Sequence, residues 1–129
     1  ALAGLVAITA EPLTPTPGLA IVIGSIGALI MYFGTKMLES FGIDDVVGAI
    51  PVHMFAGIFG TLVVPISNSD TSFGTQFVGM ISICAFSFVL SYLVFAALKA
   101  TVGLRISKAA EKQGTDKSEI GVTAYSIRD

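Results

Sequence analysis

Residues 71–98, TSFGTQFVGMISICAFSFVLSYLVFAAL, form a stretch of 28 residues without Asp, Glu, Lys or Arg. Residues 12–35 and residues 46–69 form two more such stretches, each 24 residues long. A helix needs about 20 apolar residues to cross a hydrocarbon core about 30 Å thick, whereas the apolar run of a soluble core helix is usually about 10–14 residues. The three stretches therefore predict an all-α polytopic membrane protein.

The composition of the whole chain points the same way. Of its 129 residues, 53% are hydrophobic and 12% are charged, and the mean hydropathy is +0.86. A soluble domain carries about 25% charged residues, so this chain has too few charges to cover a soluble surface. Its hydrophobicity excludes a disordered chain, and its single cysteine excludes an internal disulfide framework. The formal net charge of −2 argues against nucleic acid as a partner.

Turn-forming residues mark the expected boundaries. The TPTP stretch at residues 14–17 is polar and extended, and we expect the first full helix to start near Pro17 or Gly18, because proline suits a first turn. Gly42 is a candidate C-terminal cap, and Pro65 is expected to end the second helix. We expect a transmembrane region over residues 1–103 and a polar tail over residues 104–129. Within the transmembrane region we expect a partial helix at 1–10 and full helices at about 17–38, 46–64 and 73–103.

The distribution of positive charge predicts the orientation in the membrane. Six of the seven Lys and Arg residues lie at or after Lys99, and the seventh is Lys36. Cytoplasmic segments carry an excess of Lys and Arg, so we expect the tail to be cytoplasmic. The membrane itself is expected to be the plasma (inner) membrane. Counting back through the helices then makes residues 41–45 cytoplasmic and residues 67–70 external.

The first ten residues, ALAGLVAITA, are typical of the end of a transmembrane helix. No basic region precedes them, as a signal peptide would require, and there is no initiating Met. We therefore expect the chain to be the C-terminal fragment of a larger protein.

Small residues recur along all three expected helices. Such spacing lets membrane helices approach closely, so we expect each helix to pack against others. The small residues in question are Ala20, Gly24 and Ala28 in the first helix, Ala56, Gly57 and Gly60 in the second, and Ser87, Ser91, Ala96 and Ala100 in the third.

His53 is the main candidate functional residue. It follows Asp45 by eight residues, which places it about 12 Å into the second helix at about 1.5 Å per residue. Ionisable groups at this depth are costly and commonly mark a substrate or proton path. The alternative is a neutral imidazole that hydrogen-bonds between helices. Pro51, two residues earlier, removes a backbone donor and is expected to kink the helix.

Other chemistry is not indicated by the sequence. A phosphate-binding loop of the GxxxxGK[ST] type does not occur, and one His with one Cys cannot form a metal site. Cys84 is expected to be a packing residue. Asp44 and Asp45 suit a helix N-terminus, where the helix dipole favours negative charge. We therefore expect no catalytic residues, no metal and no cofactor, and hence not an enzyme.

Three blocks of sequence resemble the ammonium transporter family (Amt/Mep/Rh). The longest is IDDVVGAIPVH at residues 43–53, followed by AGIFGTL at residues 56–62. The others are AGLVAIT at residues 3–9 and TVGLRIS at residues 101–107, with Gly114 and a Gly121…Ala124-Tyr125 pattern further along the tail. The resemblance covers nearly the whole chain, in order and with matching spacing.

The resemblance implies a fold of eleven helices, of which this chain would supply the end of helix 8, helices 9–11 and the tail. It implies a homotrimer with one pore per subunit, ammonium or ammonia as substrate, and membrane lipid around it. His53 matches the second of the family's paired pore histidines. Asp45 matches a residue that helps to hold the cytoplasmic end of a helix.

The tail resemblance implies regulation. In the family this segment contacts neighbouring subunits and, in bacteria, lies near the docking site of PII-type regulatory proteins. Ser118 falls where some plant members carry a regulatory phosphothreonine, although a plain solvated serine is the simpler interpretation. Ser107 suits the cap of a short helix that ends at Gly114. Two departures stand out, Ile120 in place of a common His and Glu11-Pro12 in place of Gly-Cys.

A second class of function remains open at this point. The chain could instead be a small three-helix membrane subunit with a structural or assembly role.

Overall fold

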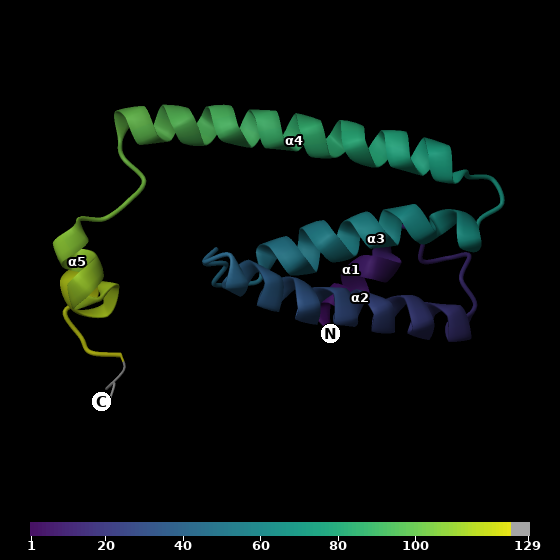
Figure 1. Cartoon of the computed structure of the whole chain (residues 1–129), viewed down its shortest axis with the longest axis horizontal. Helices are drawn as coiled ribbons and strands as arrows, with labels where there is room; N and C mark the ends of the chain where they lie inside the picture. The colour runs from purple at the N-terminus through teal and green to yellow at the C-terminus, as the bar shows by residue number, and fades with distance from the viewer. Residues whose placement is uncertain (125–129) are drawn as a thin grey trace. The chain divides into compact units, whose positions relative to one another are not determined.

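A computed structural model describes residues 1–124, and these residues contain helices and turns but no strand. They divide into two compact units, one over residues 1–86 and the other beginning at Ser87. The helices are α1 (Leu2–Thr9), α2 (Pro17–Ser40), the π-helix η1 (Ile50–Phe55), α3 (Ala56–Val63), the 3-10 turn η2 (Val64–Ile66), α4 (Phe73–Thr101), α5 (Lys108–Gln113) and the π-helix η3 (Asp116–Ile120) (Figure 1). Tyr125 and the end of the expected tail lie outside the described residues.

Helix α2 has a defined cap at each end. At its start the hydroxyl of Thr16 accepts a hydrogen bond from the Leu19 N–H at 3.3 Å, and Pro17 occupies the first turn. At its end Gly42 adopts φ of +69°. The N–H groups of Gly42 and Ile43 donate to the carbonyls of Glu39 and Leu38, each at 3.0 Å. This pattern is the Schellman motif, which satisfies carbonyls that the helix end leaves free.

The second helical stretch begins later than the expected residue 46. Val46 and Val47 lie in a turn, and Gly48 has φ of +68°. The stretch then continues through η1, α3 and η2 to Ile66. The charge-free stretch of sequence therefore begins before the helix does. The residues of the turn that precedes the helix are as apolar as those of the helix itself.

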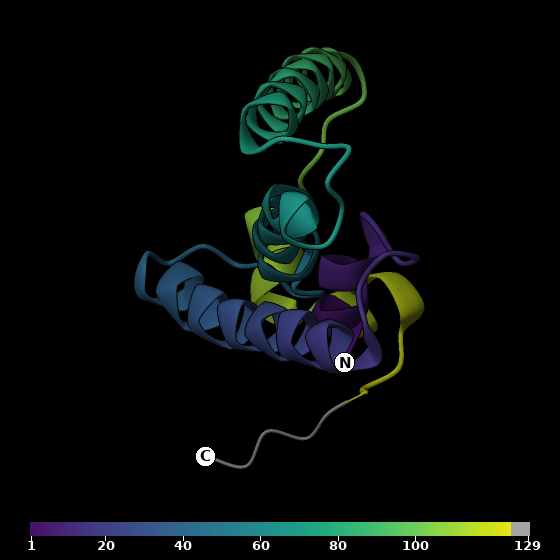
Figure 2. The same cartoon turned by 90° about the vertical axis from the view of Figure 1, so that its right-hand side faces the viewer.

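The tightly packed part of the structure is formed by α1, α2, η1 and α3, which we call the bundle. Helix α1 packs against both α2 and α3, as Figure 2 shows from the side. A Cβ atom on Gly24 would meet the backbone of Gly4 in ordinary contact at 3.7 Å, but one on Gly27 would lie only 2.6 Å from the Ala7 Cβ. A Cβ on Gly60 would overlap the Ala7 carbonyl. The helices therefore meet backbone to backbone, as small residues permit.

Helix α4 has none of its residues buried. It ends at Thr101, with Gly103 at φ of +79° just beyond, so the helix is two residues shorter than expected. The small residues that were expected to mark a packing face, such as Ser91 and Ala96, are exposed like their neighbours. By length and composition α2 and α4 could each cross a membrane, whereas the helical stretch Ile50–Ile66 is shorter.

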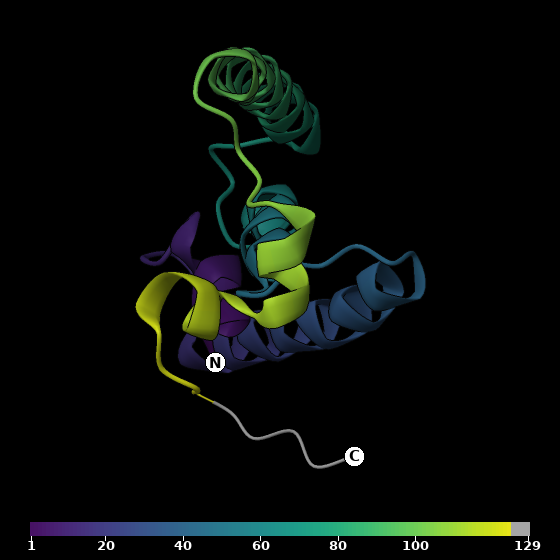
Figure 3. The same cartoon turned by 90° about the vertical axis from the view of Figure 1, so that its left-hand side faces the viewer.

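Polar contacts organise the tail. The hydroxyl of Ser107 accepts a hydrogen bond from the Ala110 N–H at 3.2 Å and caps α5, which ends at Gly114. The guanidinium of Arg105 donates from its Nε to Glu111 at 2.5 Å. The π-helical turn η3 follows α5 after two residues, and Figure 3 shows these two short segments in light green and yellow.

Candidate functional site around His53

His53 lies in the π-helical turn η1 and is exposed in the structure, whereas Pro51 and Val52 before it and Ala56 after it are buried. The Ala56 N–H donates to the carbonyls of both Pro51 and His53. Pro51 lies in the first turn of η1, where its missing N–H breaks no helical hydrogen bond. The bond from the Ala56 N–H to the Pro51 carbonyl spans five residues, as in a π-helical turn, and such turns are frequent at functional sites.

The imidazole of His53 borders a hollow of about 220 Å³ within residues 1–86. Gly57 and Thr61 follow His53 along the same helical stretch and line this hollow, and Met80 and Cys84 line it from α4. Cys84 is partly exposed and unpaired. Among the described residues, no three His, Cys, Asp or Glu side chains come together as a metal site.

Asp45 fixes the start of the helical stretch that carries His53. Its two carboxylate oxygens accept hydrogen bonds from the N–H groups of Ala49 at 2.9 Å and Ile50 at 2.7 Å. These N–H groups belong to the first turn, where no helical carbonyl is available to them. Asp44 is exposed. Both carboxylates, together with Thr35 and Glu39 of α2, line a hollow of about 90 Å³.

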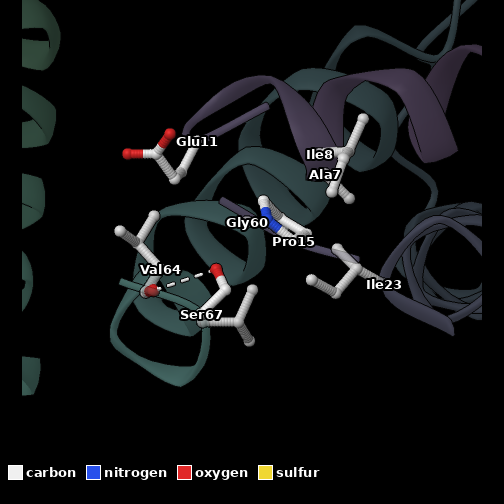
Figure 4. A pocket seen from close by; sticks show the side chains of 9 residues that line it. Ala7, Ile8, Glu11, Pro15, Ile23, Gly60, Val64 and Ser67 are labelled. Atoms are coloured by element: carbon white, nitrogen blue, oxygen red, sulfur yellow. Dashed lines mark hydrogen bonds between the residues drawn. The ribbon is translucent and has the colours of Figure 1, made fainter. Parts of the chain in front are cut away.

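The opposite end of the bundle is closed by loop contacts. The Nδ2 amide of Asn68 donates to Glu11 at 2.9 Å, and the Thr14 hydroxyl donates to Ser67 at 3.1 Å. Figure 4 shows Ala7, Gly60, Ile23 and Ser67 around one small hollow, with the Glu11 carboxylate directed away from it. The hollow among them is only about 10 Å³, so the helix ends pack closely there.

Ser118 is exposed in η3, and its hydroxyl donates to the Gly114 carbonyl at 2.9 Å. Nearby, the N–H of Ala124 donates to the Asp116 carboxylate at 2.9 Å. This hydrogen bond is the main cause of a lowered pKa for Asp116, and the ion pair with Glu111 raises the pKa of Arg105. Ser118 therefore lies in a short segment that is folded by polar contacts.

Two residues with close contacts in the structure, Gly34 and Glu11, were not identified from the sequence as contact residues. Gly34 packs against the η1 turn, and Glu11 joins Asn68 across 57 residues of sequence. The small-residue spacing pointed to Ala20, Gly24 and Ala28, which lie on a different set of positions from the buried Gly27 and Gly34. Glu11 was noted only as a departure from a pattern, because its partner is distant in sequence.

Comparison with known proteins gives a consistent result. The chain matches the Ammonium Transporter Family over residues 1–125. Ammonium transporter Amt2 of Archaeoglobus fulgidus is 36% identical, in a match that covers 97% of this chain and 31% of the relative. Ammonium transporter Amt1 of Haloferax mediterranei is also 36% identical, covering 96% of this chain and 25% of the relative.

A third relative, ammonium transporter Amt1 of Methanocaldococcus jannaschii, is 33% identical over 96% of this chain and 34% of its own length. The chain thus spans about a quarter to a third of the length of these curated relatives. The matches do not favour the alternative of a small structural or assembly subunit.

Proposed function

Because the chain belongs to the ammonium transporter family, an all-helical membrane family, we propose that it forms part of a pore that conducts ammonium or ammonia, with His53 as the pore imidazole. The family assignment and the apolar helices α2 and α4 support an integral membrane protein. The observation that carries the role of His53 is its placement: it points out of the bundle, from a π-helical turn, beside a mostly apolar hollow.

The proposed chemistry follows from the properties of imidazole. A bare ammonium ion is costly to place in an apolar pore, since a charge at the membrane centre costs several kcal/mol. A neutral imidazole offers one hydrogen-bond donor and one acceptor, so it can bind ammonia or take part in moving a proton. Gly57 lines the same hollow as His53. The partner histidine that the resemblance implies would supply the second such group.

We propose a positioning role for Asp45 at the cytoplasmic end of this helix, and a lesser one for Asp44. The hydrogen bonds from Ala49 and Ile50 to Asp45 support this role, because they hold the first turn before η1. The contacts of Glu11 with Asn68 and of Thr14 with Ser67 bring two loops to one end of the bundle. That placement fits the proposed topology, with residues 67–70 outside and the tail in the cytoplasm of a plasma (inner) membrane.

For the assembled protein we propose a homotrimer surrounded by membrane lipid, with a PII-type protein as a regulatory partner at the tail. Ser118 is the proposed regulatory position, and its exposed hydroxyl supports access by a modifying enzyme. The protein is proposed to act as a transporter and not as an enzyme.

The test is transport by the full-length gene product in lipid vesicles. We expect His53→Ala to lose most of the ammonium-dependent flux per folded protein. Met37→Ala is the control, because Met37 is 45% exposed on α2 and does not line the hollow beside His53. Wild-type flux in the His53→Ala protein, at equal folded amount, would refute the role of His53.

A further inference from the structure

Gly34 lies where α2 packs against the turn that carries His53. A Cβ atom on Gly34 would lie 2.7 Å from Cδ2 and 3.1 Å from Cε2 of the Phe55 ring, and 3.1 Å from Cβ of Pro51. The first distance is shorter than carbon atoms approach without a shift of one partner. Gly34 itself is buried. Because Gly34 has only a hydrogen atom where other residues carry Cβ, η1 can lie close to α2 at this position.

The two residues that touch Gly34 lie on either side of His53 in one helical turn. Pro51 is buried, Phe55 is partly buried, and both face α2, whereas His53 is exposed on another side of η1. Moving Pro51 and Phe55 away from α2 therefore rotates or displaces the backbone that bears the imidazole.

The turn cannot easily relieve a clash by sliding along its axis. Asp45 holds the N–H groups of Ala49 and Ile50 on one side of the turn. On the other side Ala56 is fully buried and Gly60 lies against the Ala7 carbonyl. Because both ends of the turn are held, a side chain added at Gly34 should displace mainly the residues between Ile50 and Ala56.

A second glycine of α2 provides an internal comparison. Gly27 lies seven residues before Gly34, about two turns away on the same helix face. A Cβ on Gly27 would lie 2.6 Å from Cβ of Ala7 and 2.8 Å from the carbonyl of Ala3. Both of these neighbours belong to α1, which carries no part of the His53 turn. Both glycines are thus crowded, but Gly34 by side-chain atoms of η1 and Gly27 by the Cβ of Ala7 and the backbone of Ala3.

We infer that Gly34 is a positioning residue for His53: it sets the distance of the π-helical turn from α2 and so the placement of the imidazole in the transport path. This inference rests on the proposed role of His53 in transport. It predicts that crowding at Gly34 lowers transport by each folded molecule, whereas crowding at Gly27 lowers only the stability of the fold.

The experiment compares single variants of the full-length gene product in lipid vesicles, with flux normalised to folded protein and thermal stability measured in parallel. We expect Gly34→Ala to lower the normalised flux about tenfold or more, since small displacements of a functional group are costly. Gly27→Ala is expected to lower the thermal midpoint while its normalised flux stays at the wild-type level. Gly24→Ala is the mild control, because its Cβ would meet only ordinary contact, 3.7 Å from the Gly4 carbonyl.

Phe55→Val keeps the proposal testable if Gly34→Ala does not fold. Valine lacks the ring carbons that face Gly34, so the single variant introduces no clash but removes the contact that sets the turn. We expect it to lower normalised flux when alone and to restore part of the flux when combined with Gly34→Ala. A merely structural glycine would give neither result.

The outcomes separate the two proposals. If wild-type protein shows no ammonium-dependent flux, or His53→Ala conducts normally, the proposed function fails. If wild type conducts and His53→Ala does not, but Gly34→Ala and Phe55→Val conduct like wild type per folded molecule, the inference about Gly34 is overturned. Equal normalised losses in Gly34→Ala and Gly27→Ala would also overturn it.

Discussion

The bundle and helix α4 have similarly apolar sequences but very different surroundings. In the bundle, Gly27 and Gly60 bring α2 and α3 into direct contact with α1. In α4, large side chains such as Phe77, Ile83 and Phe88 are all more than half exposed. Apolar sequence alone therefore does not specify which helices pack together. Close packing occurs where small residues let one backbone approach another.

Helix α4 also lacks a distinct polar face, because its own apolar side chains point in all directions around its axis. None of its residues is buried. A helix that is hydrophobic on all sides is suited to apolar surroundings. The bundle buries its small residues inside, and α4 presents its large ones outward. We therefore expect the same kind of substitution to have different effects on stability in the two regions.

The largest expected difference comes from truncating one isoleucine in each region. Ile23 in the bundle is 4% exposed, and Ile83 in α4 is 68% exposed. Ile23→Ala should lower the free energy of unfolding by about 2–4 kcal/mol because it leaves a cavity. Ile83→Ala should change it by less than about 0.5 kcal/mol. Unfolding of full-length protein in mixed micelles measures both, and equal losses would show that α4 is packed like the bundle.

Gly→Ala substitutions should change the free energy of unfolding by a smaller amount, and with opposite sign in the bundle and in α4. Gly60→Ala places a methyl group on the Ala7 carbonyl, and overpacking of this kind costs about 1–3 kcal/mol. At Gly79 in α4 no atom lies within 4 Å of the added carbon. Gly79→Ala should therefore stabilise the helix, by up to about 1 kcal/mol. The same unfolding assay decides, and stabilisation by Gly60→Ala would contradict the close approach.

The loop contact between Glu11 and Asn68 should contribute less than either packing effect. A hydrogen bond to a charged group contributes roughly 1.5–3 kcal/mol at most, and this one is only partly buried. We expect a coupling free energy of about 0.5–1 kcal/mol from the cycle of Glu11→Ala, Asn68→Ala and the double variant. Additive single losses would show that the two side chains do not act together.

The smallest effect concerns the tail, which is folded by polar contacts rather than by small residues. The hydrogen bond from the Ala124 N–H lowers the pKa of Asp116 below its ordinary value of about 4. The resulting stabilisation is fully present above that ordinary value and is lost as the pH falls through the lowered pKa. Amide exchange at Ala124 should therefore quicken relative to a reference peptide in acid.

Asp116→Asn is the control for this acid step. The amide cannot ionise, so exchange at Ala124 should no longer change with pH beyond its chemical dependence. An acid step of unchanged size in Asp116→Asn would assign the step to another group. The bundle is expected to keep its protection over the same pH range.

The sequence predicted the helical class and the long helices well, because a charge-free run leaves little alternative to a helix. It placed the start of the second helix too early, since Val46 and Val47 are as apolar as helical residues. The turn that they form depends on the Asp45 carboxylate and on Gly48. Hydropathy contains no information about such local hydrogen bonds.

The candidate site shows the same division. His53 is a candidate from the sequence because a lone ionisable residue in an apolar stretch is conspicuous, and its role stays a prediction. Gly34 was not, because the identity of its neighbour depends on how α2 is rotated against η1. Small residues recur at several spacings in α2, and only the packed structure distinguishes Gly27 and Gly34 from Gly24.

The late start of the second helical stretch also affects its fit to a bilayer. Ile50–Ile66 rises about 26 Å at about 1.5 Å per residue, which is a few ångströms less than a typical hydrocarbon core of about 30 Å. Helix α4 is much longer and can match the same thickness only by tilting or projecting. A span shorter than the hydrocarbon core is matched by local thinning of the bilayer, by flanking side chains that reach the interface, or by assembly with other helices. The two helical stretches therefore place different demands on the same bilayer.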